Sequence, residues 1–194
     1  MENNVENLNE IKDEKKDKEK LVYNIYDFCE SAITAIIFIM LLFVFVCRFL
    51  NVDGNSMVPT LSNGDKVVAM SAKYTPAYGD IVIVAQPNVF DEPIIKRVIA
   101  TSGQTVNISN GYVYVDGKKL EEPYVAELTA KLGDQEYPLE VPDGYVFVMG
   151  DNRNRSTDSR FKIIGLIDER YILGKVKLRI LPFGNWNVYK NFNA

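Results

Sequence analysis

Histidine is absent from the 194 residues of this chain. This absence excludes a Ser-His-Asp or Cys-His catalytic arrangement within the chain, and also a zinc protease of the His-Glu-x-x-His kind. Any acid–base chemistry must therefore use lysine, aspartate, glutamate, tyrosine or a thiol. Cysteine is scarce as well, because Cys29 and Cys47 are the only two and both lie in or beside an apolar stretch. We therefore expect no disulfide scaffold, no metal site and no cofactor.

An excess of positive charge is also missing. The formal net charge is −4, and residues 1–30 account for all of it with 5 lysines and 9 acidic residues. Residues 31–194 hold 17 basic and 17 acidic side chains and are neutral overall. A neutral main domain offers no basic field to a nucleic acid, so we expect no such partner. The first 20 residues are almost wholly polar, which predicts a disordered tail or a frayed helix.

One long apolar run follows this charged tail. Residues 31–47 are 17 consecutive uncharged residues, and Phe49 and Leu50 beyond Arg48 extend the run. About 20 apolar residues are needed for a helix to cross the hydrocarbon core of a bilayer. A buried helix of a soluble protein and a cleavable secretory signal are the alternatives. The run is longer than a secretory signal core and no Ala-x-Ala site follows it, so we interpret residues 31–50 as an uncleaved transmembrane anchor.

The orientation of this anchor follows from the lysines that precede it. Five lysines lie between residues 12 and 20, whereas after Arg48 the next basic residue is Lys66. The positive-inside rule then places residues 1–30 in the cytoplasm as a charged tail and residues 51–194 outside. The chain therefore reads as a single-pass membrane protein with an extracytoplasmic domain.

Residues 51–194 have the pattern of a mainly β, antiparallel domain. Short β-branched and aromatic runs are bounded by turn residues, at 81–84, 106–109, 112–115 and 145–149. Asn110-Gly111 joins two of these runs and is a strong hairpin signal, and Asp116-Gly117 marks a second turn. Helical periodicity is weak in this region, and residues 125–132 are the one stretch where it could indicate a short helix. We expect residues 105–142 to form a smaller β insertion.

Two segments could carry chemistry without histidine. Ser56, in Gly54-Asn-Ser-Met-Val-Pro-Thr-Leu, could be an exposed nucleophile, and Gly54 would let the backbone approach a ligand closely. Lys96 would share one strand face with Ile94 and Val98, and desolvation by such neighbours lowers the pKa of a lysine. A neutral lysine can act as a general base. The alternatives are a plain turn at Ser56 and a lysine extending to solvent from an edge strand.

A third segment, residues 149–160, reads MGDNRNRSTDSR and follows an apolar strand. Its density of polar residues is high for a simple loop, although a solvated turn remains the alternative. Asp158 and Arg160 are two residues apart and could pair, and Ser156 and Ser159 could orient other side chains. With no histidine in the chain, a serine nucleophile needs another base, and a desolvated lysine is the physical alternative.

These segments together resemble the bacterial type I signal peptidases, which are membrane-anchored Ser-Lys proteases, in their smaller Gram-positive-type form. The resemblance covers about residues 35–182 and follows the family order. GNSMVPTL is similar to the family's nucleophile segment, YGDIVIV to its second, IIKRVI to its lysine segment and MGDNRNRSTDSR to its last. The family usually continues the lysine segment as Gly-Leu-Pro-Gly-Asp, where residues 100–104 here are Ala-Thr-Ser-Gly-Gln.

The resemblance implies a role for each matching position. Ser56 would be the nucleophile, Lys96 the general base and Ser156 the residue that orients the lysine. The backbone N–H of Ser56 would stabilise the oxyanion together with a backbone donor at Gly54, which has no hydroxyl. The remaining positions fall into two sets. Structural support would come from Asp151, Arg153, Asp158 and Arg160, and the substrate pocket would be lined by Met57, Leu61 and Ile95.

The implied activity is removal of signal peptides from exported preproteins after a small residue, through an acyl-enzyme, at the outer face of the plasma membrane. The implied partners are preprotein signal peptides and the lipid bilayer, with no metal and no nucleic acid. Ser56 follows Leu50 by only six residues, so we expect the site to lie close to the membrane. Two rivals remain open: a self-cleaving Ser-Lys repressor-type protein, and a catalytically silent anchored β domain that serves binding or assembly.

Overall fold

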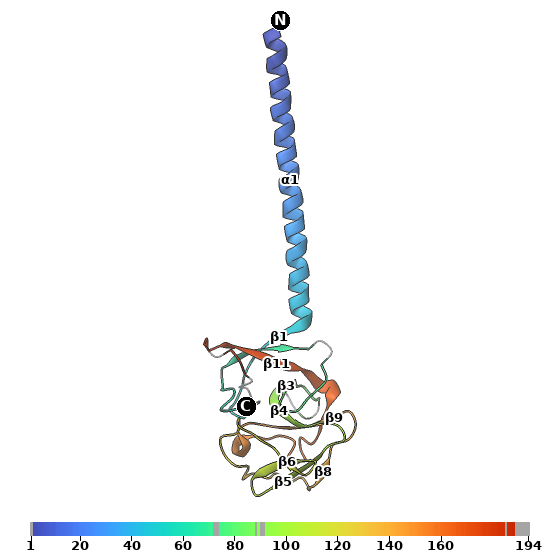
Figure 1. Cartoon of the computed structure of the whole chain (residues 1–194), viewed down its shortest axis with the longest axis vertical. Coiled ribbons are helices and arrows are strands. Elements are labelled where there is room, and N and C mark those ends of the chain that lie inside the picture. The colour runs from blue at the N-terminus through green and yellow to red at the C-terminus, as the bar shows by residue number, and fades with distance from the viewer. Residues whose placement is uncertain (1, 72–73, 88, 90–91, 185, 189–194) are drawn as a thin grey trace. The chain divides into compact units, whose positions relative to one another are not determined.

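The structure is a computed structural model that describes residues 2–71, 74–87, 89, 92–184 and 186–188 (Figure 1). The side chains of residues 2–15, 17, 19 and 42–46 lie outside this description. The chain divides into two units, Met1–Phe45 and Val46–Ala194. The first is helical and the second contains all of the described strands.

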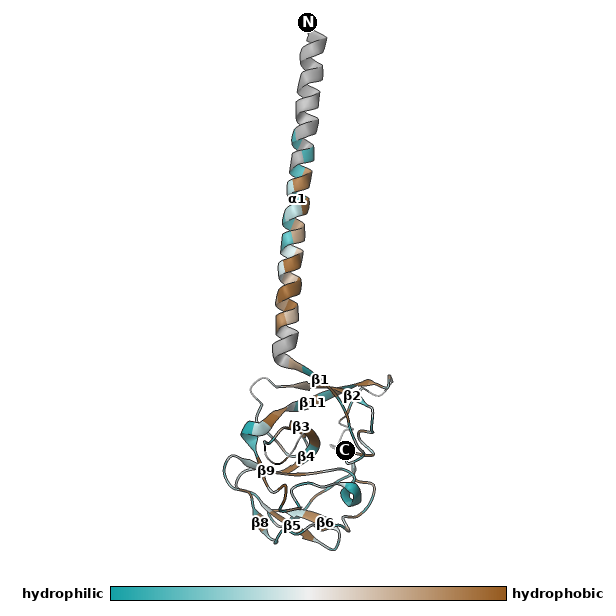
Figure 2. Cartoon of the chain, turned by 180° about the vertical axis from the view of Figure 1, so that it is seen from behind, coloured by the Kyte–Doolittle hydropathy of each residue, from teal (hydrophilic) through white to brown (hydrophobic). Residues whose placement is uncertain are grey.

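Helix α1 (Glu2–Val46) forms the first unit. Among the described side chains, Lys20–Leu41 is long and apolar enough to cross a membrane, and none of it is buried by protein (Figure 2). The helix also continues back through the charged tail to Glu2, where the sequence predicts disorder or a frayed helix. Lysine and glutamate are good helix formers, so a polar segment can prolong a helix that apolar residues anchor.

The helix ends before residue 50, the predicted end of the anchor. The helix ends at Val46, and β1 (Cys47–Asn51) follows at once, so that Phe49 and Leu50 belong to a strand. Strand β1 pairs antiparallel with β2 (Lys66–Met70) along its whole length, from Cys47 opposite Met70 to Asn51 opposite Lys66. An apolar run does not distinguish helix from strand, and here the pairing partner decides where the helix stops.

The described part of the second unit contains a seven-stranded sheet in the order β1-β2-β11-β3-β4-β9-β10. All of its pairs are antiparallel, which confirms the predicted mainly β, antiparallel fold. Its further strands are β3 (Ile81–Val84), β4 (Ile94–Ala100), β9 (Tyr145–Met149), β10 (Ile167–Asp168) and β11 (Ile172–Leu181).

The centre of this sheet is apolar on both faces. In β3 all four residues are buried: Ile81 and Ile83 pack in one cluster, and Val82 and Val84 in another. Side chains alternate along a strand, so a continuous apolar run is what a strand covered on both faces requires. Strand β4 pairs with β3 and is buried almost throughout, and this burial encloses the Lys96 that it carries.

A four-stranded sheet, in the order β7-β6-β5-β8, occupies residues 105–140, where the sequence predicts a smaller β insertion. Its strands are β5 (Thr105–Ser109), β6 (Tyr112–Val115), β7 (Lys118–Lys119) and β8 (Leu139–Glu140). The turn between β5 and β6 uses Asn110 at φ 51° and Gly111 at φ 82°. Two consecutive positive φ values are the hairpin geometry that Asn-Gly favours, so this prediction is confirmed.

The segment that precedes β8 is irregular, and no helix forms at 125–132. The backbone of this segment is instead hydrogen-bonded to a side chain from another part of the chain. The amides of Ala130 and Lys131 both donate to the side chain of Asn154, which in turn donates to the carbonyl of Leu128. These bonds replace the internal bonds of a helix, which local periodicity alone could not anticipate. The loop at residues 101–104 is also tight, because the Gln104 side chain accepts a hydrogen bond from the amide of Thr101.

Candidate active site

Ser56 lies in the loop that connects β1 to β2. Gly54 adopts φ 81°, a left-handed conformation that favours glycine, and its amide donates to the side chain of Asn63 at 2.9 Å. The amide of Leu61 donates to the carbonyl of Met57 and closes the turn that follows the serine. The Gly54 N–H is therefore already engaged, and its predicted use as an oxyanion donor would require this bond to Asn63 to break.

Lys96 comes from the middle of β4, where it pairs with Val82 of β3. Its side chain is only 4% exposed. The Nζ atom lies 2.8 Å from the Ser56 hydroxyl oxygen and also donates to the carbonyl of Ile95 at 3.0 Å. The two residues, 40 positions apart in sequence, thus meet at the distance at which a proton can pass between them.

The environment of Lys96 lowers its pKa from the ordinary 10.5 to about 8. Burial is the dominant cause, since it disfavours the charged ammonium, and the positive charge of Arg160 acts in the same direction. The carboxylates of Asp158 and Asp151 oppose the shift. A lysine general base must be neutral when it acts, and the lowered pKa makes the neutral amine accessible in the mildly alkaline range.

Each of the two acids near the lysine is paired with an arginine that compensates its negative charge. Arg160 binds Asp158 in bidentate fashion, with N–O distances of 2.7 and 2.8 Å, and both side chains are fully buried. The amide of Gly150 also donates to Asp158. Burial works to raise the pKa of Asp158, but the bonds from Arg160 and Gly150 outweigh it and hold the pKa below its ordinary value.

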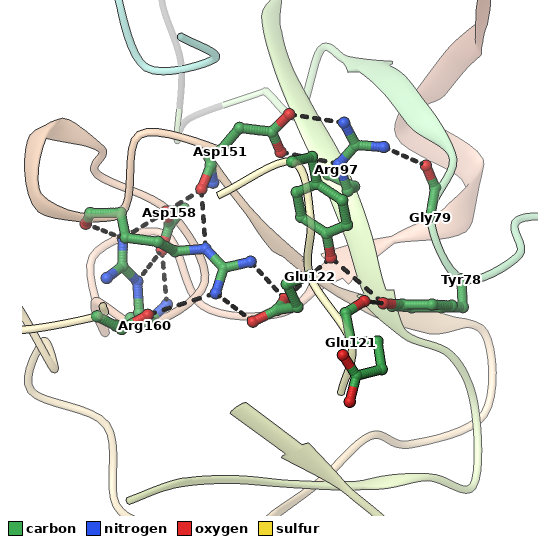
Figure 3. Close-up of polar contacts among 12 residues, drawn as sticks. Tyr78, Gly79, Arg97, Glu121, Glu122, Asp151, Asp158 and Arg160 are labelled. Atoms are coloured by element: carbon green, nitrogen blue, oxygen red, sulfur yellow. Dashed lines mark hydrogen bonds and ion pairs between the residues drawn. The ribbon is translucent and has the colours of Figure 1, made fainter. Parts of the chain in front are cut away.

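Asp151 has a comparable partner in Arg97, the residue after Lys96. Arg97 donates to both carboxylate oxygens of Asp151, at 2.8 and 2.6 Å, and to the carbonyl of Gly79 at 2.7 Å (Figure 3). The hydroxyl of Thr60 donates to the same carboxylate at 2.5 Å. Asp151 therefore joins strand β4 to the loop that carries Ser56.

Arg153 is a further buried charge near the site. It lies in η1 (Arg153–Arg155) and binds both carboxylate oxygens of Glu122, at 2.9 and 2.5 Å. The ring of Tyr124 faces the Arg97 guanidinium, with 3.9 Å between ring centre and carbon, and its hydroxyl donates to Glu122. Residues 121–124, whose role the sequence left open, thus brace the loop at residues 150–160.

The resemblance predicts a hydrogen bond between Ser156 and Lys96, and this bond is not formed. The side chain is buried, and no residue that the structure describes stands at hydrogen-bonding geometry to its hydroxyl. The hydroxyl still helps to lower the pKa of Asp158, so it lies near that carboxylate in an imperfect geometry. Its Oγ is packed against Gly150, where an added Cβ would come within 2.4 Å of it. Lys96 Nζ donates instead to the Ser56 hydroxyl and the Ile95 carbonyl.

A groove of about 280 Å³ opens beside Ser56 and Lys96. Met57 and Ile95 line it, as the predicted pocket requires. Leu61 does not: its side chain is fully buried in the core cluster that also contains Val67 and Ile81. The rest of the lining comes from the neighbouring stretches of β1 and β4, namely Leu50, Asn51, Val52, Asp53, Glu92, Pro93 and Ile94.

Sequence reasoning did not find several residues that build the site. Asp151, which the sequence does single out, is bound by Arg97 and Thr60. Arg153, also singled out, is bound to Glu122. One signal was available, because an arginine within an apolar strand must be matched by an acid if it is buried. The identity of that acid depends on tertiary contacts between segments more than 50 residues apart.

Comparisons with known proteins place the chain in one family. Residues 25–181 match the family described as "Signal peptidase, peptidase S26". The signal peptidase I S of Bacillus subtilis is 38% identical over 184 residues, which cover 89% of this chain and 96% of that protein. The probable signal peptidase I-1 of Synechocystis is 37% identical over 171 residues, covering 81% and 83%.

A crystal structure of a signal peptidase I from Enterococcus faecalis is also similar, with 29% identity and a TM-score of 0.44. The alignment covers 53% of this chain and 97% of that one. The family match spans well over half of the chain, and the curated relatives match over most of their own length. The chain therefore belongs to the signal peptidase family, peptidase S26.

Proposed function

We propose that this protein is a type I signal peptidase that removes signal peptides from exported preproteins with a Ser56–Lys96 dyad. The observation that carries the proposal is the 2.8 Å contact between Lys96 Nζ and Ser56 Oγ, made by a lysine whose pKa is lowered to about 8. A buried lysine at this distance has the properties of a general base for a serine nucleophile.

The proposed reaction has two stages. Neutral Lys96 takes the proton of the Ser56 hydroxyl, and Oγ attacks the scissile carbonyl carbon to form a tetrahedral oxyanion, which the Ser56 N–H stabilises. The C–N bond then breaks, the Lys96 ammonium gives its proton to the leaving amine, and an acyl-enzyme remains. In the second stage Lys96 takes a proton from water, the hydroxide attacks the ester, and Ser56 recovers its proton as the signal peptide leaves.

The groove fits an extended substrate with small side chains. Strand β4 pairs with β9 only from Arg97 to Ala100, so within the described residues the β9-side edge at Ile94–Lys96 has no strand partner. Such an edge can hydrogen-bond an extended peptide backbone. Apolar side chains of Met57 and Ile95 line the adjoining groove. This combination supports the Ala-x-Ala type of specificity that the family resemblance implies.

A lipid contact is part of the same proposal. Phe49 of β1 and Leu178 of β11 both lie opposite Val68 of β2, so the three share one face of the sheet. Phe49 and Leu178 are exposed, and so are Phe183 and Trp186 in the segment that folds back on β11, where the Arg179 amide donates to the Trp186 carbonyl. We call Phe49, Leu178, Phe183 and Trp186 the apolar face. Exposed apolar patches of this kind mark contact sites for membranes or partners.

The proposed location is the plasma membrane, with the lysine-rich N-terminus in the cytoplasm and the peptidase unit on the outer face. Ten residues separate the end of α1 at Val46 from Ser56, and ten residues span at most about 35 Å. This short connection keeps the nucleophile near the end of the anchor. It suits a substrate whose own apolar segment is embedded in the same bilayer.

Cleavage of a purified preprotein by the full chain in detergent or lipid vesicles tests the proposal. Wild-type protein should release the mature protein, whereas Ser56→Ala and Lys96→Arg should both be inactive, since arginine cannot supply a neutral base. Lys118→Ala, at an exposed position of β7, is the control and should remain active. Absence of cleavage by wild type would favour a silent binding module, and cleavage only of its own chain would favour the repressor-type alternative.

A further inference from the structure

Asn152 bonds the backbone on either side of the nucleophile. Its amide donates to the carbonyl of Ser56 at 3.0 Å, and its side-chain Nδ2 donates to the carbonyl of Asn55 at 3.1 Å. Asn152 lies 97 positions from Asn55 in sequence and is half-buried at the edge of the site. The amide of Val58 also approaches the Asn55 carbonyl, at a longer 3.3 Å.

The bond to Asn55 fixes more than a carbonyl. The Asn55 carbonyl and the Ser56 N–H belong to one planar peptide group, which is not among the cis bonds of the chain. In a trans peptide these two dipoles point in opposite directions, so anchoring the oxygen also sets the direction of the N–H. A donor on the oxygen further polarises the peptide and makes its N–H a better donor.

The Ser56 N–H is available to donate a hydrogen bond to a substrate. The structure shows no acceptor for the Ser56 amide among the residues it describes, and the Gly54 amide is already bonded to Asn63. We propose that Asn152 is a positioning residue that aims the Ser56 N–H at the oxyanion of the reaction. The proposal rests on the function proposed above and concerns the same site.

The contact can be removed without disturbing its neighbours. Asn152→Ala deletes the Nδ2 bond and retains the backbone amide that holds the Ser56 carbonyl. Asn152→Asp has nearly the same shape but turns a carboxylate oxygen toward the Asn55 carbonyl, where it cannot donate. The matched control is Asn154→Ala, two residues further on, because the hydrogen bonds of the Asn154 side chain go to residues 127–131 and, among the described residues, none goes to the Ser56 loop.

Steady-state preprotein cleavage by the full chain gives the first readout. The Asn152 bond should act in the transition state, so we expect kcat to fall about tenfold in Asn152→Ala and at least as much in Asn152→Asp. KM and the apparent pKa of the pH–rate profile should stay at their wild-type values, because substrate binding and Lys96 are not touched. Asn154→Ala should retain the wild-type kcat, and thermal unfolding of all variants should confirm that they are folded.

Binding measurements provide the second readout. A peptide aldehyde forms a tetrahedral adduct with the serine, so it should bind about tenfold more weakly to Asn152→Ala than to wild type. An uncleaved substrate peptide should bind equally to Ser56→Ala and to Ser56→Ala/Asn152→Ala. The proposal is overturned if Asn152→Asp keeps the wild-type kcat, if only KM changes, or if the loss accompanies a shifted pKa or a lowered unfolding temperature. If wild type itself does not cleave preprotein, the proposed function fails instead.

Discussion

The charge state of Lys96 results from a competition among its immediate neighbours. Burial and Arg160 favour the neutral amine, whereas Asp158 and Asp151 favour the ammonium. Each of those two acids is bound by its own arginine, Arg160 or Arg97, at less than 3 Å. Their negative charge is therefore largely compensated, and burial prevails.

This balance predicts how cleavage depends on pH. With a pKa of about 8, the neutral fraction of Lys96 is roughly a tenth at pH 7 and most of the population at pH 9. We expect kcat/KM on a preprotein to rise about tenfold between these two values, with an inflection near pH 8. Lys118→Ala should show the same profile. A flat profile across this interval, or an inflection near the ordinary 10.5, would contradict the role of Lys96 as base.

The same shift has a consequence for stability. Between about pH 8 and 10.5 the unfolded chain binds the Lys96 proton and the folded chain does not, so the free energy of unfolding rises with pH in this window. Below pH 8 the buried ammonium costs about 3 kcal/mol, because burial lowers the pKa of Lys96 from 10.5 to about 8 and a tenfold change in an equilibrium is worth about 1.4 kcal/mol.

Denaturation by urea, followed through the fluorescence of Trp186, measures this cost. The difference in unfolding free energy between wild type and Lys96→Met should increase by about 3 kcal/mol from pH 8 to pH 10.5, in favour of wild type. The same comparison with Lys118→Met should show no such slope, because Lys118 is exposed. A constant difference for Lys96→Met would mean that the lysine is not desolvated in the folded protein.

Single residues also show what could be predicted from the sequence. Ser56, Lys96 and the Asp158–Arg160 pair are brought together as expected, because each lies in a short segment whose residue types already restrict its chemistry. The predicted hydrogen bond between Ser156 and Lys96 is not formed, and the Gly54 amide is bonded to Asn63. Those contacts depend on rotamers and on a competing acceptor, Asn63, which no local pattern reveals.

Among the structural elements, strand β4 connects the two halves of the site. It presents Lys96 to Ser56 and Arg97 to Asp151, and Asp151 in turn accepts from Thr60 of the loop that carries the serine. Both members of the Arg97–Asp151 pair are fully buried. Such a pair contributes little net stability, but removing one partner leaves an uncompensated charge in the interior.

Asp151→Asn should therefore lower the free energy of unfolding by about 3–5 kcal/mol and reduce cleavage, because Arg97 keeps its charge without a carboxylate. Glu136→Gln is the matched control: Glu136 pairs with Lys162 at 3.4 Å on the surface, with both side chains largely exposed. Its loss should cost less than about 1 kcal/mol. Equal effects of the two substitutions in urea denaturation would show that the buried pair does not organise the site.

Element boundaries were the least predictable level. The runs at 81–84, 112–115 and 145–149 are strands because each is a short stretch of β-branched and aromatic residues bounded by turn signals. The anchor, in contrast, stops at Val46, where pairing of β1 with β2 competes with helix. Residues 125–132 carry a weak helical period but bond to Asn154 instead. In both cases a distant segment provides the bonds that decide the local structure.

At the scale of the whole molecule, an apolar helix and a β unit with an exposed apolar face occur in one chain. Each surface would be costly in water, and a bilayer can accommodate both. Trp186 belongs to the apolar face and is the only tryptophan of the sequence, so its fluorescence reports on this face alone. Tryptophan also favours the interface between water and lipid.

We expect Trp186 to be quenched when the full chain is reconstituted in vesicles that contain lipids brominated on their acyl chains. The control is the double variant Trp186→Phe/Leu132→Trp, in which the only tryptophan lies at an exposed position of the 120–140 segment. Quenching of this tryptophan should be weak. Replacing Phe49 and Leu178 with serine should weaken the quenching of Trp186 and slow the cleavage of membrane-embedded preprotein, with little effect on a short soluble peptide. Equal quenching at positions 186 and 132, or none at 186, would mean that the apolar face does not meet the lipid, and the anchor alone would then hold the peptidase unit at the membrane.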